Sequence, residues 1–252
     1  MSPVAHRRIG TGPVRVIVLH DWFGTAEHWG AALDCLDPEG FSWALLDYRG
    51  YGRRREVPGA YTVPEIAGDV LALADELGWE SFRLVGHSMG AKVAQQVLAR
   101  APGRVERLLG VAPVPPGPYE LDEQGLALFR GARDRPENRR AVIDLVTGRR
   151  LGDRWLDAMV ERSLSDSLPE AFGAYFESWH ALDLEPSVKG SPLPVRLLVG
   201  AFDLALDAEF IARTWLPSYP NARIEVLPGT GHYPPHETPV AFAAAVEEFL
   251  RD

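Results

Sequence analysis

A serine stands between two glycines in Gly86–Gly90, which follows the apolar run Phe82–Val85 and precedes a stretch with helical periodicity, Ala91–Arg100. A strand that enters a helix through so short a turn strains the backbone of the middle residue, and its neighbours must lack side chains for the two elements to approach. The turn also places the following N–H at a helix N-terminus, where a developing negative charge is favoured. The pattern predicts that Ser88 is a nucleophile.

An acid and a base follow two later strands in the order that this chemistry needs. The apolar run Val195–Val199 leads to Asp203, and Arg223–Leu227 leads through a glycine-rich loop to His232. A serine hydroxyl is a poor nucleophile unless an imidazole takes its proton and a carboxylate orients that imidazole. The order nucleophile, acid, base therefore predicts that Ser88, Asp203 and His232 act together.

Two other aspartates compete for the role of the acid. Asp207 is placed to cap the expected helix Ala208–Trp215, and Asp183 lies where the chain returns to the sheet. Only Asp203 directly follows a strand, so we expect it to be the acid. Asp183 and Asp207 remain the alternatives.

With these residues, three further motifs resemble the α/β-hydrolase superfamily, in its cap-bearing branch of esterases, lactonases, epoxide hydrolases and dehalogenases. The motifs are Leu19–Gly24, Asp47–Gly52 and Gly231–Pro234, and the resemblance covers nearly the whole chain. It implies a serine hydrolase without cofactor or metal that cleaves a carboxylic ester or lactone through an acyl-enzyme on Ser88. Epoxide hydrolases and dehalogenases need an aspartate at this position, so the serine excludes their chemistry.

The resemblance also implies where the oxyanion is held and which residues line the pocket. Its donors are the backbone N–H groups of Trp22 and Met89, with the Phe23 N–H as an alternative, because Asp21 stands where the family usually has glycine. Aromatic residues beside the catalytic loops and in the cap predict a pocket for a substrate with an apolar part. These pocket residues are Phe23, Trp179, Phe202 and Tyr233.

Fold does not fix chemistry, so two alternatives to hydrolysis remain. Cofactor-free perhydrolases, lyases and dioxygenases of the superfamily use a similar site. A small-molecule receptor with slow hydrolase activity is a third function, from a different class of protein. Turnover distinguishes them, because a receptor releases product very slowly.

Strands alternate with helices along most of the chain, which predicts an α/β fold with a mostly parallel sheet covered on both faces. In such a sheet the ligand site lies at the carboxyl ends of the strands. The expected strands are Val14–His20, Ser42–Leu46, Phe82–Val85, Arg107–Val111, Val195–Val199 and Arg223–Leu227. The helices between and after them are Ala26–Leu36, a helix from the cap Thr62 to about Leu77, Ala91–Arg100, Ala208–Trp215 and Pro239–Arg251.

A proline-rich segment after Val111 interrupts this alternation, and about seventy residues follow without a convincing strand. We expect a helical cap over about residues 115–186, inserted into a single domain of residues 1–252 whose core is 1–114 and 187–252. Its expected helices are Glu123–Gly131, Glu137–Val146, Arg154–Ser163 and Glu170–Ala181.

Composition limits the partners and the compartment. The net charge is −9 and no basic stripe offsets it, which argues against nucleic-acid binding. The single Cys35 excludes an internal disulfide and is expected in the core, and no apolar run reaches the length of a membrane span. With no signal-peptide pattern at the start, these features predict a cytoplasmic protein whose partner is a small-molecule ester or lactone. The sequence does not indicate an oligomeric state.

One histidine pair has the spacing of metal ligands. His232 and His236 are four residues apart, but Pro234 and Pro235 between them prevent the helix that would place both imidazoles on one face. No metal site is therefore expected.

Overall fold

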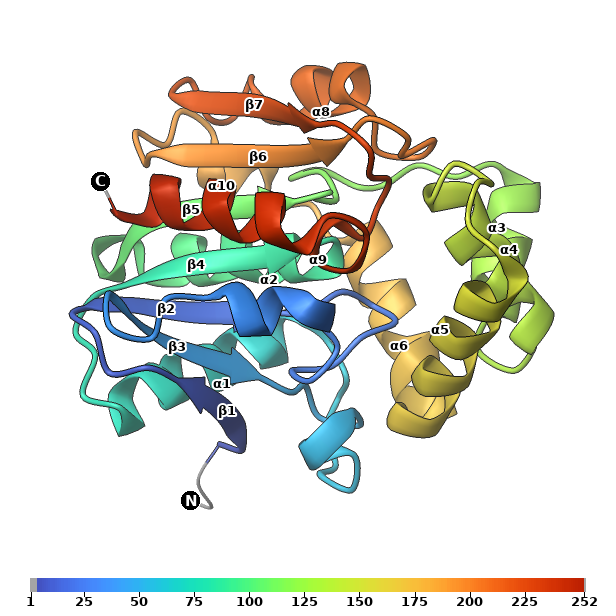
Figure 1. The fold of residues 1–252 in the computed structure, drawn as a ribbon, viewed down its shortest axis with the longest axis horizontal. Helices are drawn as coiled ribbons and strands as arrows, with labels where there is room; N and C mark the ends of the chain where they lie inside the picture. Colours follow the sequence, from blue (N-terminus) through green and yellow to red (C-terminus); the bar gives the residue numbers. More distant parts are fainter. Residues whose placement is uncertain (1–3, 252) are drawn as a thin grey trace.

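A seven-stranded sheet forms the centre of the computed structural model, which describes residues 4–251 (Figure 1). The strand order is β1-β3-β2-β4-β5-β6-β7; β1 runs antiparallel to β3 and all other neighbours are parallel. The mostly parallel α/β sheet predicted from the sequence is thus confirmed. The strands are β1 (His6–Ile9), β2 (Val14–Leu19), β3 (Phe41–Leu46), β4 (Phe82–His87), β5 (Val105–Val111), β6 (Val195–Gly200) and β7 (Ala222–Leu227).

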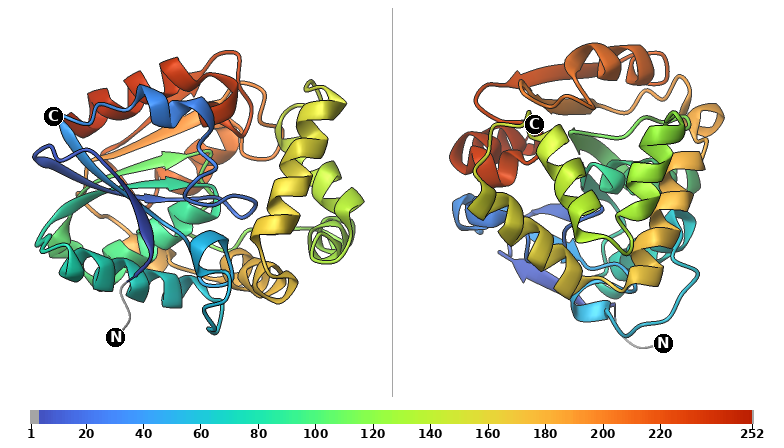
Figure 2. Two further views of the ribbon diagram at one scale, coloured as in Figure 1. Left: turned by 60° about the horizontal axis from the view of Figure 1, so that its bottom comes forward. Right: turned by 90° about the vertical axis from the view of Figure 1, so that its right-hand side faces the viewer.

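Helices cover both faces of the sheet because alternate strand residues point to opposite sides. In β2, Ile17 and Leu19 pack into the cluster formed with α1, α2 and α8, whereas Val16 and Val18 pack into the cluster formed with η1 and α10. Figures 1 and 2 show α1 and α2 on the face of the sheet opposite α10. The bounds of these helices are α1 (Val63–Glu76), α2 (Met89–Arg100), α8 (Ala208–Trp215), the 3₁₀ helix η1 (Gly30–Cys35) and α10 (Pro239–Arg251). Shorter pieces are η2 (Gly52–Arg54), η3 (Pro102–Arg104), α7 (Glu185–Val188) and α9 (Pro234–Glu237).

Four further helices, which we call the helical layer, lie beyond the carboxyl ends of the parallel strands (Figures 1 and 2). They are α3 (Glu123–Gly131), α4 (Pro136–Val146), α5 (Asp153–Asp166) and α6 (Pro169–Ala181), close to the bounds expected from the sequence. Pro136 and Pro169 each stand at the first position of a helix, where a missing N–H costs nothing. The layer therefore covers the edge of the sheet where Ser88, Asp203 and His232 are expected.

A buried lysine ties the helical layer to the sheet. The ammonium group of Lys92, in α2, donates hydrogen bonds to the carbonyl oxygens of Pro116 (3.0 Å), Gly117 (2.6 Å) and Leu182 (2.8 Å). Burial lowers its pKa to about 7, although Asp183 opposes that shift. The helix that begins directly after Ser88 thus holds both connections of the layer.

The structure departs from the sequence-based expectations at the N-terminal end. Strand β1 was not expected, because His6–Ile9 is a polar edge strand without an apolar alternation. The helix expected over Ala26–Leu36 is only the 3₁₀ turn η1, because Gly30 has a φ of 53° and a β-carbon there would crowd His236. Cys35 is exposed rather than part of the core.

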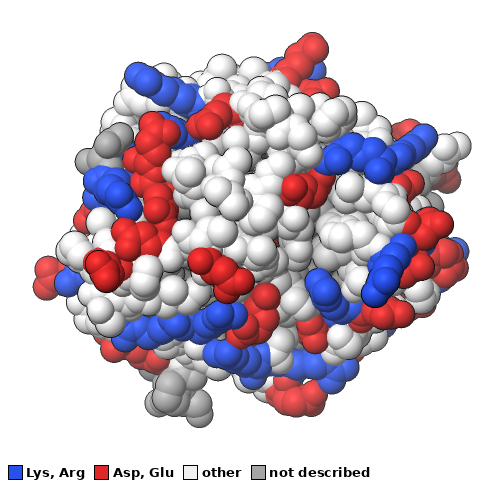
Figure 3. Space-filling model, in the orientation of Figure 1, with Lys and Arg blue, Asp and Glu red and all other residues white. Residues whose placement is uncertain are grey.

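Charge is mixed over the face in Figure 3, where acidic and basic side chains alternate around an uncharged centre. That face therefore carries no extended patch of a single charge. Within residues 4–251, no helix combines the length and the apolar character needed to cross a membrane.

Candidate active site

Ser88 lies at the junction of β4 and α2 with φ 53° and ψ −114°, a backbone conformation that residues other than glycine rarely adopt. A β-carbon on Gly86 would come within 2.5 Å of the Gly90 carbonyl oxygen, and one on Gly90 would overlap the carbonyl oxygen of Leu19. The Ser88 N–H donates to the Val111 carbonyl (2.9 Å), which fixes the turn against β5. The close approach of strand and helix thus requires both glycines.

Asp203 and His232 form a buried, hydrogen-bonded pair. His232 Nδ1 lies 2.6 Å from Asp203 Oδ2, and Asp203 is 3% exposed. The other carboxylate oxygen accepts the N–H groups of Ala205 (2.9 Å) and Leu206 (3.0 Å). A carboxylate can only accept a hydrogen bond, so His232 Nδ1 carries the proton that it donates to Asp203. In the neutral imidazole Nε2 is then unprotonated and can act as a base.

The other two aspartates lie outside this pair. Asp207 accepts the Phe210 N–H (2.7 Å) and caps α8, as its position in the sequence predicted. Asp183 is exposed and accepts the Glu185 N–H (3.0 Å). Of the three candidates, only Asp203 is hydrogen-bonded to His232.

The charges around His232 favour its protonated form. Burial alone would lower its pKa, but the carboxylates of Asp203, Asp21 and Glu237 outweigh burial and raise the pKa above 6.5. The backbone N–H of His232 donates to the carbonyl of Val146, at the end of α4 (3.1 Å). The helical layer therefore contacts the loop that carries the imidazole.

Ser88 and His232 line one cavity. Among the described residues, no hydrogen bond joins the serine hydroxyl to the imidazole. Such contacts are often long in unliganded sites and shorten when substrate binds.

Two backbone N–H groups near Ser88 are without an acceptor in the part of the chain that the structure describes, namely those of Trp22 and Met89. The alternative donor, the Phe23 N–H, is engaged by Asp21 Oδ2 (3.0 Å). Trp22 itself is fixed, because its carbonyl accepts the Tyr51 hydroxyl (3.0 Å). This arrangement favours Trp22 over Phe23 as an oxyanion donor.

The cavity beside Ser88 is small and apolar, with a volume of about 40 Å³. Aromatic rings pack tightly around it; Trp22 stacks on Phe172 of α6 with ring centroids 4.1 Å apart. None of the residues that line it is Lys, Arg, Asp or Glu. They are Trp22, Phe23, Ser88, Val114, Tyr119, Phe129, Val142, Val146, Trp179, Ala205, Leu206, His232 and Tyr233.

Three of the four predicted pocket residues, Phe23, Trp179 and Tyr233, lie on this cavity. The fourth is wrong: Phe202 is 46% exposed and its ring lies against Arg150 instead. The turn after β6 directs Asp203 inward, so the residue before it points outward. Sequence reasoning found Trp179 but missed the other lining residues of the helical layer, Phe129, Val142 and Val146, because helical spacing does not indicate which side of a helix faces the sheet.

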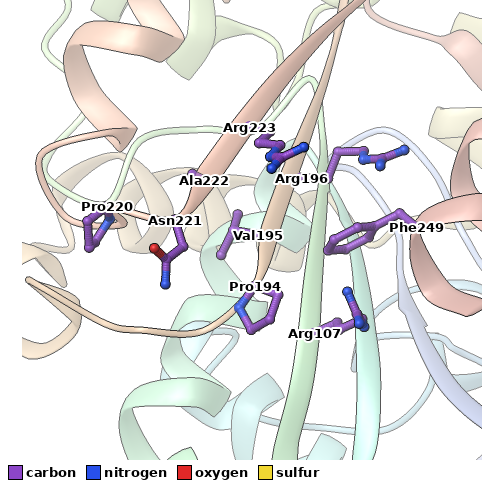
Figure 4. Close-up of a pocket in the computed structure, with 9 residues that line it drawn as sticks. All are labelled: Arg107, Pro194, Val195, Arg196, Pro220, Asn221, Ala222, Arg223 and Phe249. Carbon is purple, nitrogen blue, oxygen red and sulfur yellow. The ribbon is translucent and has the colours of Figure 1, made fainter. Parts of the chain in front are cut away.

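A hollow larger than the cavity at Ser88 lies elsewhere on the protein. A groove of about 640 Å³ lies at the amino ends of β6 and β7, opposite the candidate site, and is lined by Arg107, Arg196, Arg223 and Phe249 among others (Figure 4). Arg196 there is paired with Glu225 and Glu248. Size alone therefore does not locate the site.

His236 does not join His232 in a metal site. Its Nε2 lies 3.0 Å from the carbonyl oxygen of His28. Residues 4–251 hold no group of three or more His, Cys, Asp or Glu arranged to bind a metal ion.

The fold and this site define a hydrolase of the α/β class, and comparisons with known proteins agree. The sequence model of the alpha/beta hydrolase family matches residues 16–245. The chain is 26% identical over 228 residues to a non-heme haloperoxidase of Rhodococcus erythropolis, which covers 84% of this chain and 83% of that protein. It is 30% identical over 259 residues to a pimeloyl-[acyl-carrier protein] methyl ester esterase of Yersinia enterocolitica, with 96% and 95% covered.

A similar solved structure is that of a bromoperoxidase from Bacillus anthracis, with a TM-score of 0.87, 20% identity and coverage of 98% of this chain and 95% of that one. At this identity the likeness supports the fold alone. The family match spans nearly the whole chain, however, so this protein belongs to the alpha/beta hydrolase family.

Proposed function

We propose that the protein is a serine hydrolase that cleaves a carboxylic ester or lactone through an acyl-enzyme on Ser88. The observation that carries this proposal is that His232, paired with Asp203, lies on the same cavity as a serine held at a strained turn. The similarity to a methyl ester esterase supports it. Cytoplasmic location is part of the same proposal.

Each step then has a named residue. The Ser88 hydroxyl attacks the ester carbonyl while His232 Nε2 takes its proton, and Asp203 stabilises the imidazolium that forms. The Trp22 and Met89 N–H groups hold the tetrahedral oxyanion. His232 returns the proton to the leaving alkoxide, and water, activated by the same imidazole, hydrolyses the acyl-enzyme to the carboxylic acid.

Residues 115–186 serve as a cap in this proposal. Phe129, Val142, Val146 and Trp179 of this segment line the cavity of about 40 Å³ at Ser88. Because the cavity is small, we expect the helical layer to shift when an ester enters. The uncharged lining favours substrates that are neutral and apolar around the ester group.

Two experiments test the proposal. Purified protein is assayed on esters and lactones of graded chain length, and an alkyl phosphonate is used to label the reactive serine. We expect turnover of small neutral esters and a single label that peptide mapping places on Ser88. A label on another serine, or no turnover on any ester or lactone, would contradict the proposed function.

The pH dependence of turnover follows from the charges around His232. Only the neutral imidazole accepts the serine proton, so kcat/KM should fall as the pH drops through the pKa of His232. Because that pKa is raised, the inflection should lie above 6.5. Initial rates at low substrate concentration across the neutral range measure it. A rate that stays constant below pH 6.5 would show that another group is the base.

Removal of the proposed oxyanion donor should lower turnover on small esters. Trp22→Pro deletes the N–H and should reduce kcat by about 10²–10³-fold, the usual effect of losing one such donor. Trp22→Phe keeps the N–H and the aromatic stack, so it should retain most of the turnover. Circular dichroism checks that both variants are folded, and equal small losses would place the donor elsewhere.

The similarity to a non-heme haloperoxidase favours one second function, perhydrolysis. In that reaction hydrogen peroxide replaces water, attacks the acyl-enzyme and leaves as a peroxycarboxylic acid, while the Ser88 hydroxyl is restored. The peroxycarboxylic acid would oxidise bromide to hypobromous acid and be reduced to the carboxylic acid, and the hypobromous acid would brominate an indicator dye. If the dye reacts no faster with enzyme, ester, peroxide and bromide than without enzyme, this second function is excluded.

A further inference from the structure

Asp21 is a buried carboxylate at the position where the family usually has glycine. It follows β2 and His20 and is 4% exposed. A β-carbon on Gly24 would overlap Asp21 Oδ1, so the carboxylate is packed against its own loop. The mechanism above assigns it no role.

One oxygen of Asp21 fixes the loop that carries the proposed oxyanion donor. Asp21 Oδ2 accepts the Phe23 N–H at 3.0 Å. A glycine could not make this bond, and the Phe23 N–H would then compete with the Trp22 N–H for the acceptor in the cavity. The bond therefore determines which N–H of the loop remains free.

The other oxygen faces His87, which in turn contacts the loop that carries His232. Asp21 Oδ1 lies 3.8 Å from His87 Nδ1, too far for a hydrogen bond. His87 Nε2 lies 2.8 Å from the His232 carbonyl oxygen, which can only accept, so this nitrogen carries the proton. Burial, as the largest effect, lowers the pKa of His87 to about 4. His87 is then neutral at pH 7 and does not neutralise Asp21.

The negative charge of Asp21 therefore acts on the imidazole that becomes charged during the reaction, that of His232, whose ring centroid lies 5.2 Å from that of His87. We propose that Asp21 is a positioning residue of this site: it fixes the Phe23 N–H so that the Trp22 N–H faces the substrate, and its charge stabilises the His232 imidazolium. This inference rests on the proposed function. Asp203 remains the residue that orients the imidazole.

Other titratable groups also face His232, and the test must separate Asp21 from them. Asp203 comes from the loop after β6, Glu237 from α9, His87 from the end of β4, and Tyr233 follows His232 itself. Asp203 has the largest favourable effect on the pKa of His232, and that of Asp21 exceeds that of Glu237. An isosteric change at Asp21 leaves all of these groups in place.

Two substitutions divide the two parts of the role. Asp21→Asn removes the charge but keeps an oxygen that accepts the Phe23 N–H. The acidic limb of the pH profile of kcat/KM should therefore move to lower pH by about one unit, and kcat at high pH should be nearly unchanged. Asp21→Gly removes both, so the same shift should be accompanied by a kcat about 10- to 100-fold lower at unchanged KM. If Asp21 had a purely structural role, both substitutions would lower the stability of the protein without moving the acidic limb of the pH profile.

The control is Asp47→Asn. Asp47 is a buried carboxylate on the next loop, where it accepts the N–H groups of Ala26 and Arg53. The Asp47→Asn substitution should leave the acidic limb of the pH profile of kcat/KM unchanged. A limb that does not move in Asp21→Asn, or that moves equally in Asp47→Asn, would overturn the inference.

The titration of His232 can also be followed by NMR, with His232→Gln to assign its signal. This measurement needs no turnover, so it separates the two proposals. If the parent protein hydrolyses no ester, the proposed function fails whatever the titration gives. If esters are hydrolysed and the titration of His232 is the same in Asp21→Asn as in the parent, only the role of Asp21 fails.

Discussion

Ser88→Ala should lower ester turnover by about 10⁶-fold, the loss expected when the nucleophile of a serine hydrolase is removed. Alanine has no hydroxyl to form the acyl-enzyme, so the remaining groups can only assist a direct attack by water. Within residues 4–251 the Ser88 side chain makes no hydrogen bond that supports the turn, and the contacts to Val111 and Ala91 come from its backbone. The fold should therefore survive the change.

Steady-state assays of highly purified protein measure this loss, and thermal unfolding checks the fold. Ser165→Ala is the matched control, since Ser165 is an exposed serine on α5 and its loss should leave turnover unchanged. Because a contaminating esterase would mask the effect, the phosphonate should first be shown to label the parent protein in a one-to-one ratio. Undiminished turnover by Ser88→Ala would refute the acyl-enzyme on this residue.

The parts of the fold that the sequence predicted are those in which local pattern and tertiary structure agree. The run Val195–Val199 is apolar except for Arg196 because helices cover both faces of the sheet at β6, and it appears as a strand with one residue added. Gly86 and Gly90 predicted the elbow because no other residue fits there. In the helical layer, the expected helices Glu137–Val146 and Glu170–Ala181 each begin one residue later than α4 and α6, which start at Pro136 and Pro169.

The errors arise where tertiary contacts override local pattern. Strand β1 is polar and pairs only at the edge, so nothing in His6–Ile9 distinguishes it from a loop. Ala26–Leu36 has a helical pattern, but Gly30 turns the chain against α9 and leaves only a 3₁₀ turn. The direction of Phe202 depends on the turn after β6, which is set by the bonds of Asp203.

The candidate site shows the same division. The sequence predicted that Ser88, Asp203 and His232 act together, and the structure brings all three to one end of the sheet. The contact of Asp21 with the Phe23 N–H is local, since the two residues are two positions apart. Its approach to His87 could not be predicted, because His87 comes from another strand, β4. Nor could the sequence give the size of the cavity, which depends on how rings such as Trp22 and Phe172 pack.

Asp203→Asn should lower kcat by about 10⁴-fold, as when a triad aspartate becomes an amide. The amide oxygen can still accept the Ala205 and Leu206 N–H groups, which leaves the amide N–H directed at His232 Nδ1. That nitrogen must then be the acceptor, so the proton moves to Nε2, the atom that has to take the proton of Ser88. The imidazole is in place but in the wrong tautomer.

Asp207→Asn and Asp183→Asn are the controls for this prediction, because both aspartates were alternatives for the acid. Neither is hydrogen-bonded to His232, so each variant should keep kcat within a few-fold of the parent. A larger loss in either control than in Asp203→Asn would mean that the 2.6 Å contact of Asp203 with His232 is structural only. Recovery of kcat in Asp203→Asn at high pH would support the tautomer argument instead, because a hydroxide ion can then replace the base.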